Sequence, residues 1–189
     1  MVKDFILASS SPQRRMLLAQ IGYEPKAICP ADIDEKEKFC ERPSAYVKRI
    51  AKAKAQKVAE TNKGENILSC DTIVVIGRRL LHKATTDEEQ YQVMKLLSGK
   101  AHKVLSAVCM ISKEGKIAER LVSTRILMKR LSEEEIKAYV ASHEWQGCSG
   151  YKIEGCMEGY VRRIIGSYSG IVGLPLYETK NLLNGIGVK

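Results

Sequence analysis

The opening segment Phe5–Leu18 constrains the fold most, because it reads as a strand, a short loop and a helix in immediate succession. Phe5–Ala8 is an apolar run short enough for a buried strand, and the serines Ser9–Ser11 then interrupt it. Pro12 follows, where the first position of a helix tolerates proline, and the helix is expected over Gln13–Ile21. Strands and helices that follow one another so closely predict an α/β fold.

The start of this helix also predicts an anion-binding site. Serine hydroxyls and free backbone N–H groups at a helix N-terminus attract anions, and Arg14 and Arg15 add positive charge one turn later. These features favour a ligand that carries phosphate groups. The alternative is an ordinary serine N-cap followed by two solvated arginines.

A second apolar segment, Ile67–Ile76, carries one carboxylate, Asp71, near its centre. An ionised carboxylate that leaves water is costly unless a cation or a metal accompanies it. We therefore interpret Asp71 as a metal-binding or general-base carboxylate that faces the loop of serines and arginines. The alternative is an aspartate that caps a turn at a short break between two strands.

An amphipathic helix is predicted from Pro43 to about Glu60. Lys54 lies inside its apolar stripe, between Ile50 and Val58 on the helical wheel. A lysine in this position either extends past the edge of the core into solvent or places its ammonium group in a cleft, toward phosphates or Asp71.

The remaining pattern alternates strands, turns and helices. Strands are predicted at Tyr23–Cys29, at His102–Ser112 and Lys116–Met128, which form a long antiparallel pair, and at Val161–Ile165. Helices are predicted from a capping box at Thr86 to Leu97, from a capping box at Ser132 to Ser142, and at Tyr177–Leu183. A hairpin turn is predicted at Gly77–Arg79 and a glycine-rich turn at Gly166–Gly173.

Composition narrows the class of protein. A chain of 189 residues with 44% hydrophobic and 28% charged residues predicts one globular domain over residues 1–189, which can form two lobes around a cleft. No apolar run approaches the ~20 residues of a membrane span, and no signal peptide is evident, so we expect a cytoplasmic protein without a membrane partner.

The net charge of +9 favours anionic partners. With two phenylalanines, one tryptophan and dispersed basic residues, a nucleic-acid-binding module is not expected. The six cysteines contain no Cys-x-x-Cys pair and the chain has three histidines, so neither a structural zinc site nor a disulfide framework is predicted.

Three separated motifs resemble those of the Maf family, nucleoside triphosphate pyrophosphatases first known as septum-formation proteins. They are Ile6–Arg15, the Asp71-Thr72 pair and Gly166–Pro175, in this order along nearly the whole chain. The resemblance implies a mixed, elongated sheet with flanking helices in two lobes around a nucleotide cleft, a fold of the Maf/ITPase type. It also implies hydrolysis of a nucleoside triphosphate to the monophosphate and pyrophosphate with Mg²⁺ or Mn²⁺, a house-cleaning role in the nucleotide pool, and a homodimer.

The resemblance further implies roles for individual residues. Asp71 would bind the metal or activate water, and Glu35, in the charged loop Pro30–Lys38, would complete the acidic side of the metal site. Four side chains would hold the triphosphate: Ser9, Arg14, Lys54 and Lys83. Ala84 follows Lys83 where the family usually has proline, which makes the assignment of Lys83 the weakest of the four.

Family members differ in substrate partly at three positions, which match Gln13, Thr72 and Glu154. The branch that acts on dTTP and UTP tends to carry arginine, threonine and glutamine there, and the 7-methyl-GTP branch tryptophan, glutamine and glutamate. Thr72 agrees with the first branch, Glu154 with the second, and Gln13 with neither. The resemblance therefore leaves the base open.

Two other functions stay open at this point. One is a non-catalytic basic regulator of cell division that binds a protein or nucleic-acid partner, which the septum-formation name of the family suggests. The other is a phosphatase that releases orthophosphate. Release of orthophosphate would indicate a phosphatase, and release of pyrophosphate would indicate a pyrophosphatase.

Overall fold

The strand, loop and helix predicted at the N-terminus are present in the computed structural model, which describes residues 2–188. β1 (Val2–Leu7) leads through the three serines into α1 (Pro12–Gln20). Ser11 caps this helix because its hydroxyl accepts a hydrogen bond from the Arg14 backbone N–H. Gly22 has a φ of +77°, and this left-handed residue turns the chain from α1 toward β2 (Glu24–Ile28).

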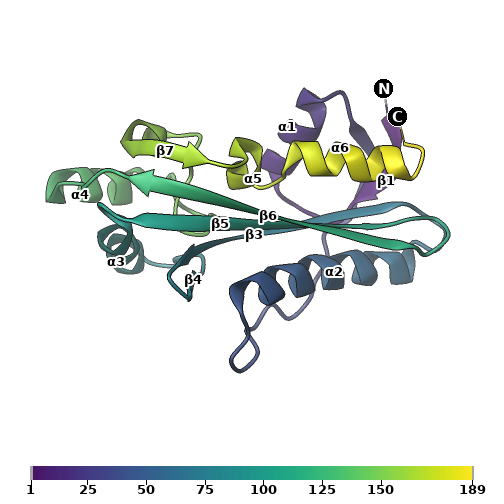
Figure 1. Cartoon of the computed structure of the whole chain (residues 1–189), viewed down its shortest axis with the longest axis horizontal. Helices are drawn as coiled ribbons and strands as arrows, with labels where there is room; N and C mark the ends of the chain where they lie inside the picture. The colour runs from purple at the N-terminus through teal and green to yellow at the C-terminus, as the bar shows by residue number, and fades with distance from the viewer. Residues whose placement is uncertain (1, 189) are drawn as a thin grey trace.

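Within residues 2–188, seven strands form one mixed sheet: six follow the order β2-β1-β3-β5-β6-β7, and β4 pairs with β3 outside this order. β1 is parallel to β2 and to β3 (Ile67–Ile76). β5 (Ala101–Ile111), β6 (Ile117–Met128) and β7 (Val161–Ile165) are antiparallel to their neighbours, and β4 (Arg79–Leu81) forms a hairpin with β3. The prediction of a mixed, elongated sheet is confirmed (Figure 1).

Helices cover both faces of the sheet. In Figure 1, α2 (Pro43–Thr61) lies below the sheet, whereas α1 and α6 (Leu176–Gly185) lie above it. Side chains along β3 alternate between the two faces, so Ile67 and Ile73 pack with α2 while Leu68 and Cys70 pack with α1 and α6. This alternation explains why almost every residue of β3 is buried.

A third cluster of buried residues lies at the other end of the sheet, around α3 (Asp87–Leu97) and α4 (Glu133–Ser142). Its largest members are Trp145, Tyr139 and Tyr151, and the short helix η1 (Cys156–Tyr160) contributes Met157. The two lobes expected from the resemblance therefore correspond to the two ends of one continuous sheet.

The structure confirms some of the local predictions and corrects others. β3 continues through Asp71 without a break, which removes the alternative of a turn-capping aspartate. The glycine-rich segment contains a short helix, α5 (Tyr168–Val172), because the Ser167 hydroxyl accepts from the Gly170 N–H and caps it. The capping box at Ser132 is complete, but at Thr86 only half is present, since Glu89 accepts from the Thr85 N–H instead.

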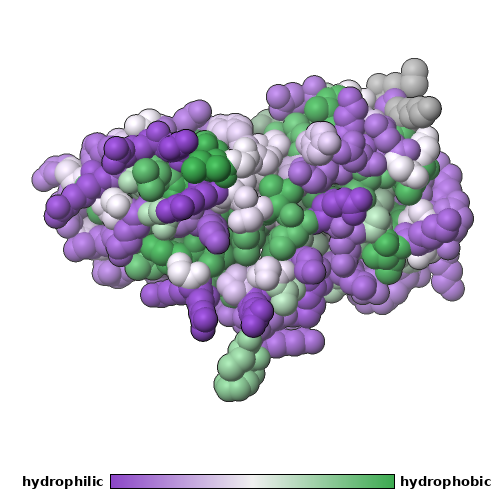
Figure 2. All heavy atoms as spheres, in the orientation of Figure 1, coloured by the Kyte–Doolittle hydropathy of each residue, from purple (hydrophilic) through white to green (hydrophobic). Residues whose placement is uncertain are grey.

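Hydrophilic residues cover most of the face shown in Figure 2, and apolar residues show between them in several separate places. The loop before α2 projects from the body in Figure 1, and it contains Phe39, a residue that is 98% exposed. Among residues 2–188, no helix combines the length and the apolarity that a bilayer crossing requires.

Candidate active site

A cavity opens where the edge of β3 is left free between two partner strands. β1 pairs with β3 at Ile67 and Leu68, and β4 pairs with it from Val74 onward. Among residues 2–188, no strand pairs with this edge between the two. The cavity at this opening has a volume of about 770 Å³, within the range of small-ligand sites. It brings together every candidate site residue of the sequence: Ser9, Gln13, Arg14, Glu35, Lys54, Asp71, Thr72, Lys83 and Glu154.

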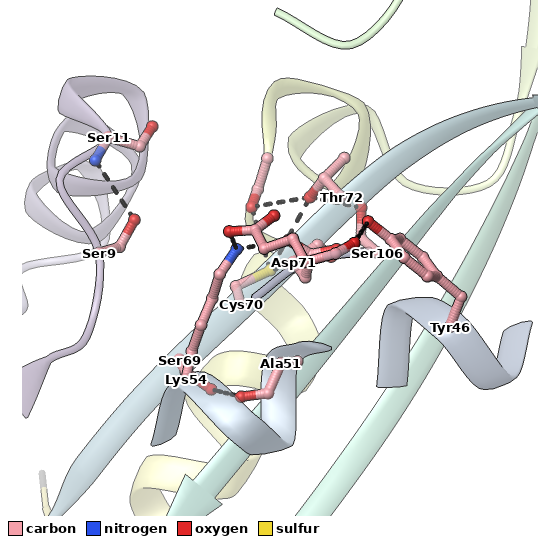
Figure 3. Close-up of polar contacts among 12 residues, drawn as sticks. Ser9, Ser11, Tyr46, Ala51, Lys54, Ser69, Cys70, Asp71, Thr72 and Ser106 are labelled. Carbon is pink, nitrogen blue, oxygen red and sulfur yellow. Dashed lines mark hydrogen bonds and ion pairs between the residues drawn. The ribbon is translucent and has the colours of Figure 1, made fainter. Parts of the chain in front are cut away.

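Two carboxylates from different elements converge on one lysine in this cavity. The Lys54 Nζ lies 2.7 Å from Asp71 Oδ1 and 2.9 Å from Glu35 Oε1. Figure 3 shows the Lys54 side chain rising from α2 toward Asp71 on β3. The side chains of Lys54 and Asp71 are only 13% and 9% exposed, whereas Glu35 is 49% exposed. Lys54 thus turns into the cavity and supplies the cation that a buried Asp71 requires.

The donor set of this acidic centre fits a divalent metal that arrives with phosphate. Mg²⁺ is usually bound by one or two carboxylates together with phosphate oxygens and water. Asp71 and Glu35 provide two such carboxylates, and the Lys54 ammonium lies within 3 Å of both, where positive charge is favoured. In the part of the chain that the structure describes, no group of three or more His, Cys, Asp or Glu residues could hold a metal alone. The remaining ligands would therefore come from the substrate and water.

The basic side of the cavity begins with Arg14 on α1. Its Nη1 donates to the Ser9 hydroxyl at 2.8 Å and its Nε donates to the Gly173 carbonyl at 3.0 Å. Gly173 has a φ of +135°, which suits glycine, so the backbone carbonyl can turn toward Arg14. These two bonds fix the guanidinium plane and leave its other N–H groups to bind an anion. Lys83 lies in the segment after β4, where its backbone forms an isolated antiparallel β-bridge with that of Ser149.

The Gly173 carbonyl also organises the hydroxyl of Thr72. Thr72 Oγ1 lies 3.2 Å from this carbonyl and 3.1 Å from the Ser106 hydroxyl, and Ser106 donates to the Gly170 carbonyl at 2.6 Å (Figure 3). Because the single proton of Ser106 is engaged by Gly170, Ser106 can only accept from Thr72. The Thr72 proton thus goes to Ser106 or to Gly173, and Thr72 offers lone pairs to a ligand in the cavity.

Glu154 lies on the wall that follows α4, together with Gln146, Cys148 and Lys152. Burial raises the pKa of the Cys148 thiol, and the nearby Glu154 charge adds to the shift, so the thiol stays protonated at neutral pH. This wall contains amide, carboxylate and ammonium groups suited to the edge of a base. Gln146 and Cys148 were not predicted as site residues.

Two further cavity residues, Tyr46 and His82, were also missed by the sequence analysis. A signal for Tyr46 exists, because Tyr46, Ile50 and Lys54 follow one another at intervals of four residues and so share one face of α2. Burial, followed by the charges of Asp71 and Glu35, raises the pKa of Tyr46 to about 12. Tyr46 is therefore a hydrogen-bond donor at neutral pH. His82 lies in an irregular segment, where periodicity gives no signal.

The family model and the curated relatives match nearly the whole chain. The family model described as Maf-like protein matches residues 4–186. The chain is 46% identical over 195 residues to the dTTP/UTP pyrophosphatase of Mesorhizobium japonicum, covering 100% of this chain and 94% of the relative. It is also 46% identical over 185 residues to the dTTP/UTP pyrophosphatase of Caulobacter vibrioides, covering 97% and 96%. Among solved structures, a HAM1 protein from Coxiella burnetii aligns with 96% of this chain and 98% of its own at a TM-score of 0.49 and 16% identity. The match to the family model includes every wall of the cavity.

Proposed function

Because this chain belongs to the Maf family, we propose that it is a nucleoside triphosphate pyrophosphatase. It would hydrolyse the anhydride between the α- and β-phosphates and release the nucleoside monophosphate and pyrophosphate. The observation that carries this proposal is the convergence of Asp71 and Glu35 on Lys54, in a cavity whose other walls hold Arg14 and Lys83. Such an enzyme would remove unwanted nucleotides from the pool.

The side chains divide into a phosphate-binding and an acidic group. Arg14, oriented by Ser9 and Gly173, would bind phosphate oxygens together with Lys83 and Lys54. Asp71 would accept a proton from the attacking water or hold the metal, with Glu35 as the second carboxylate. Phosphoryl chemistry depends largely on such positioning and charge neutralisation. A bound Mg²⁺ or Mn²⁺ would neutralise phosphate charge and polarise the phosphoryl oxygens.

For the base we propose uracil and thymine, since the relatives in Mesorhizobium japonicum and Caulobacter vibrioides are named dTTP/UTP pyrophosphatases. Thr72 supports this choice because it offers a hydrogen-bond acceptor, which matches the imide N–H of these bases. Cytosine presents an acceptor at the same ring position. Gln13 and Glu154 would contribute to the recognition of the base from the α1 side and from the segment after α4.

We further propose that residues 1–189 act as a single domain, because one sheet extends along both sides of the cavity. A cytoplasmic setting follows from the location of the nucleotide pool. A homodimer and a link to septum formation are proposed from the family resemblance alone, and we propose no nucleic-acid or membrane partner. Sedimentation of the purified protein would test the dimer.

A panel of triphosphates with Mg²⁺ or Mn²⁺ tests the proposed reaction. dTTP, UTP, CTP and 7-methyl-GTP would be compared, and pyrophosphate and orthophosphate would be measured separately. We expect pyrophosphate from dTTP and UTP. Orthophosphate as the first product would instead identify a phosphatase, and no turnover by folded protein with metal would favour the non-catalytic regulator.

A further inference from the structure

The loop that carries Glu35 has no regular structure of its own. Residues 29–42, between β2 and α2, form neither helix nor strand, and the loop projects below the sheet in Figure 1. The Glu35 side chain is 49% exposed, so packing alone does not fix its carboxylate opposite Asp71. Other side chains must hold the backbone of this loop.

Tyr46, in the second turn of α2, provides one attachment. Its ring is 3% exposed, and its hydroxyl donates to the Glu35 backbone carbonyl at 2.9 Å. Tyr46 therefore holds the backbone of Glu35 itself, the residue that supplies the second carboxylate.

Arg49, one turn further along α2, provides a second attachment. Its Nε and Nη2 donate to the two Glu41 carboxylate oxygens at 2.7 and 2.6 Å, and Nη2 also donates to the Lys36 carbonyl at 3.0 Å. The guanidinium lies 5.5 Å from the centre of the Tyr46 ring, a cation–π contact that joins the two attachments. Arg49 also lowers the pKa of Glu41 to about 2, which keeps this carboxylate charged.

His82 connects the opposite rim of the cavity to the same loop. Its Nε2 lies 2.6 Å from Glu37 Oε1, and its ring meets that of Tyr46 edge to face at 6.3 Å. His82 directly precedes Lys83, one of the proposed phosphate ligands. Contacts around Tyr46 thus reach both the acidic and the basic side of the site.

From these contacts we infer that Tyr46 is a positioning residue for the divalent metal, acting through Glu35, with Arg49 in support. α2 supplies both Lys54, which meets Asp71, and Tyr46, which holds the Glu35 backbone, so one rigid helix sets the separation of the two carboxylates. The inference rests on the proposed function. It adds that metal affinity depends on a phenol that is not itself a metal ligand.

The test is the binding of Mn²⁺ to Tyr46→Phe, measured by calorimetry or by the paramagnetic resonance of free Mn²⁺. Loss of an outer hydrogen bond typically weakens metal binding 10- to 100-fold, and we expect about tenfold here because the bond is made to the backbone. In assays with dTTP, the Mn²⁺ concentration for half-maximal rate should rise by a larger factor than kcat falls. The matched control is Tyr23→Phe, because the buried Tyr23 hydroxyl donates to Asn184 Oδ1, also at 2.9 Å, in the cluster under α1 and α6.

Equal Mn²⁺ affinity in Tyr46→Phe and the wild type would overturn the inference, and so would an equal loss in Tyr23→Phe. If Tyr46→Phe does not fold, Arg49→Lys decides, since lysine keeps the charge but cannot make the two bonds to Glu41 and the bond to Lys36 together. Unchanged Mn²⁺ affinity in that variant would equally contradict the inference. Failure of the proposed function looks different, because the wild-type protein itself would then release no pyrophosphate.

Discussion

Replacing Lys54 by methionine should destabilise the protein more than replacing either of its acidic partners. In Lys54→Met the Asp71 side chain, 9% exposed, would lose the ammonium that lies 2.7 Å away. Breaking a buried ion pair by removing one partner costs about 3–5 kcal/mol, and the open cavity favours the lower end, about 3 kcal/mol. Asp71→Asn should cost about 1–2 kcal/mol because Lys54 keeps Glu35 at 2.9 Å. Glu35→Gln should cost less than about 1 kcal/mol, since Glu35 is half exposed.

Urea denaturation at pH 7 measures this order of stabilities. The denaturation midpoints are compared among variants whose m-value equals that of the wild type. The same denaturation with added Mn²⁺ gives a second test, because a metal ion can replace the missing ammonium. Mn²⁺ should therefore raise the midpoint of Lys54→Met more than that of the wild type. A Lys54→Met protein as stable as the wild type, or less stabilised by Mn²⁺, would refute the account of a carboxylate pair that requires a cation.

Three further predictions concern other parts of the molecule. Arg14→Ala should raise the KM for dTTP by about tenfold or more, and an unchanged KM would show that Arg14 does not bind the substrate. Ser106→Ala removes one of the two acceptors of the Thr72 proton and leaves only the Gly173 carbonyl at 3.2 Å to compete with a ligand for it. Thr72 should then donate to cytosine more readily, so the ratio of kcat/KM for dTTP to that for CTP should fall. Ser69→Ala, which removes a buried serine bond of the same 2.6 Å length to Ala51 on the other face, should leave the ratio unchanged. Burial lowers the pKa of His102 to about 4 in the folded protein, below the ~6.5 of an unfolded chain, so the free energy of unfolding should fall as the pH drops from about 6.5 to 4. His102→Gln should flatten this decline in a urea titration at several pH values, and an equally steep decline would contradict the assignment.

The sequence predicted the elements whose side chains follow a clear period. The apolar run around Asp71 gave β3, because each of its faces packs against a helix. The position of Lys54 within an apolar stripe predicted that its side chain points into the cavity, since the 3.6-residue period places it on the face toward the sheet. Both inferences needed only local geometry.

Features that depend on irregular backbone could not be predicted in this way. The loop that carries Glu35 has no period, so its attachments to Tyr46 and Arg49 were missed. The helix α5 was missed because the glycines that flank and interrupt it read as a turn, whereas the Ser167 cap decides the outcome. The parallel pairing of β1 with β3 joins segments far apart in sequence, and no local pattern specifies it.

Asp71 lies at the centre of the proposed pyrophosphatase site, 2.7 Å from the Lys54 ammonium. The most direct measurement is pyrophosphate release from dTTP by the wild type and by Asp71→Asn, with near-ultraviolet circular dichroism to show that both are folded. Asparagine keeps the size of the side chain but cannot act as an anionic metal ligand or base. We predict pyrophosphate and dTMP from the wild type and a loss of at least about a thousandfold in kcat for Asp71→Asn. A folded Asp71→Asn protein that releases pyrophosphate at the wild-type rate would contradict the account.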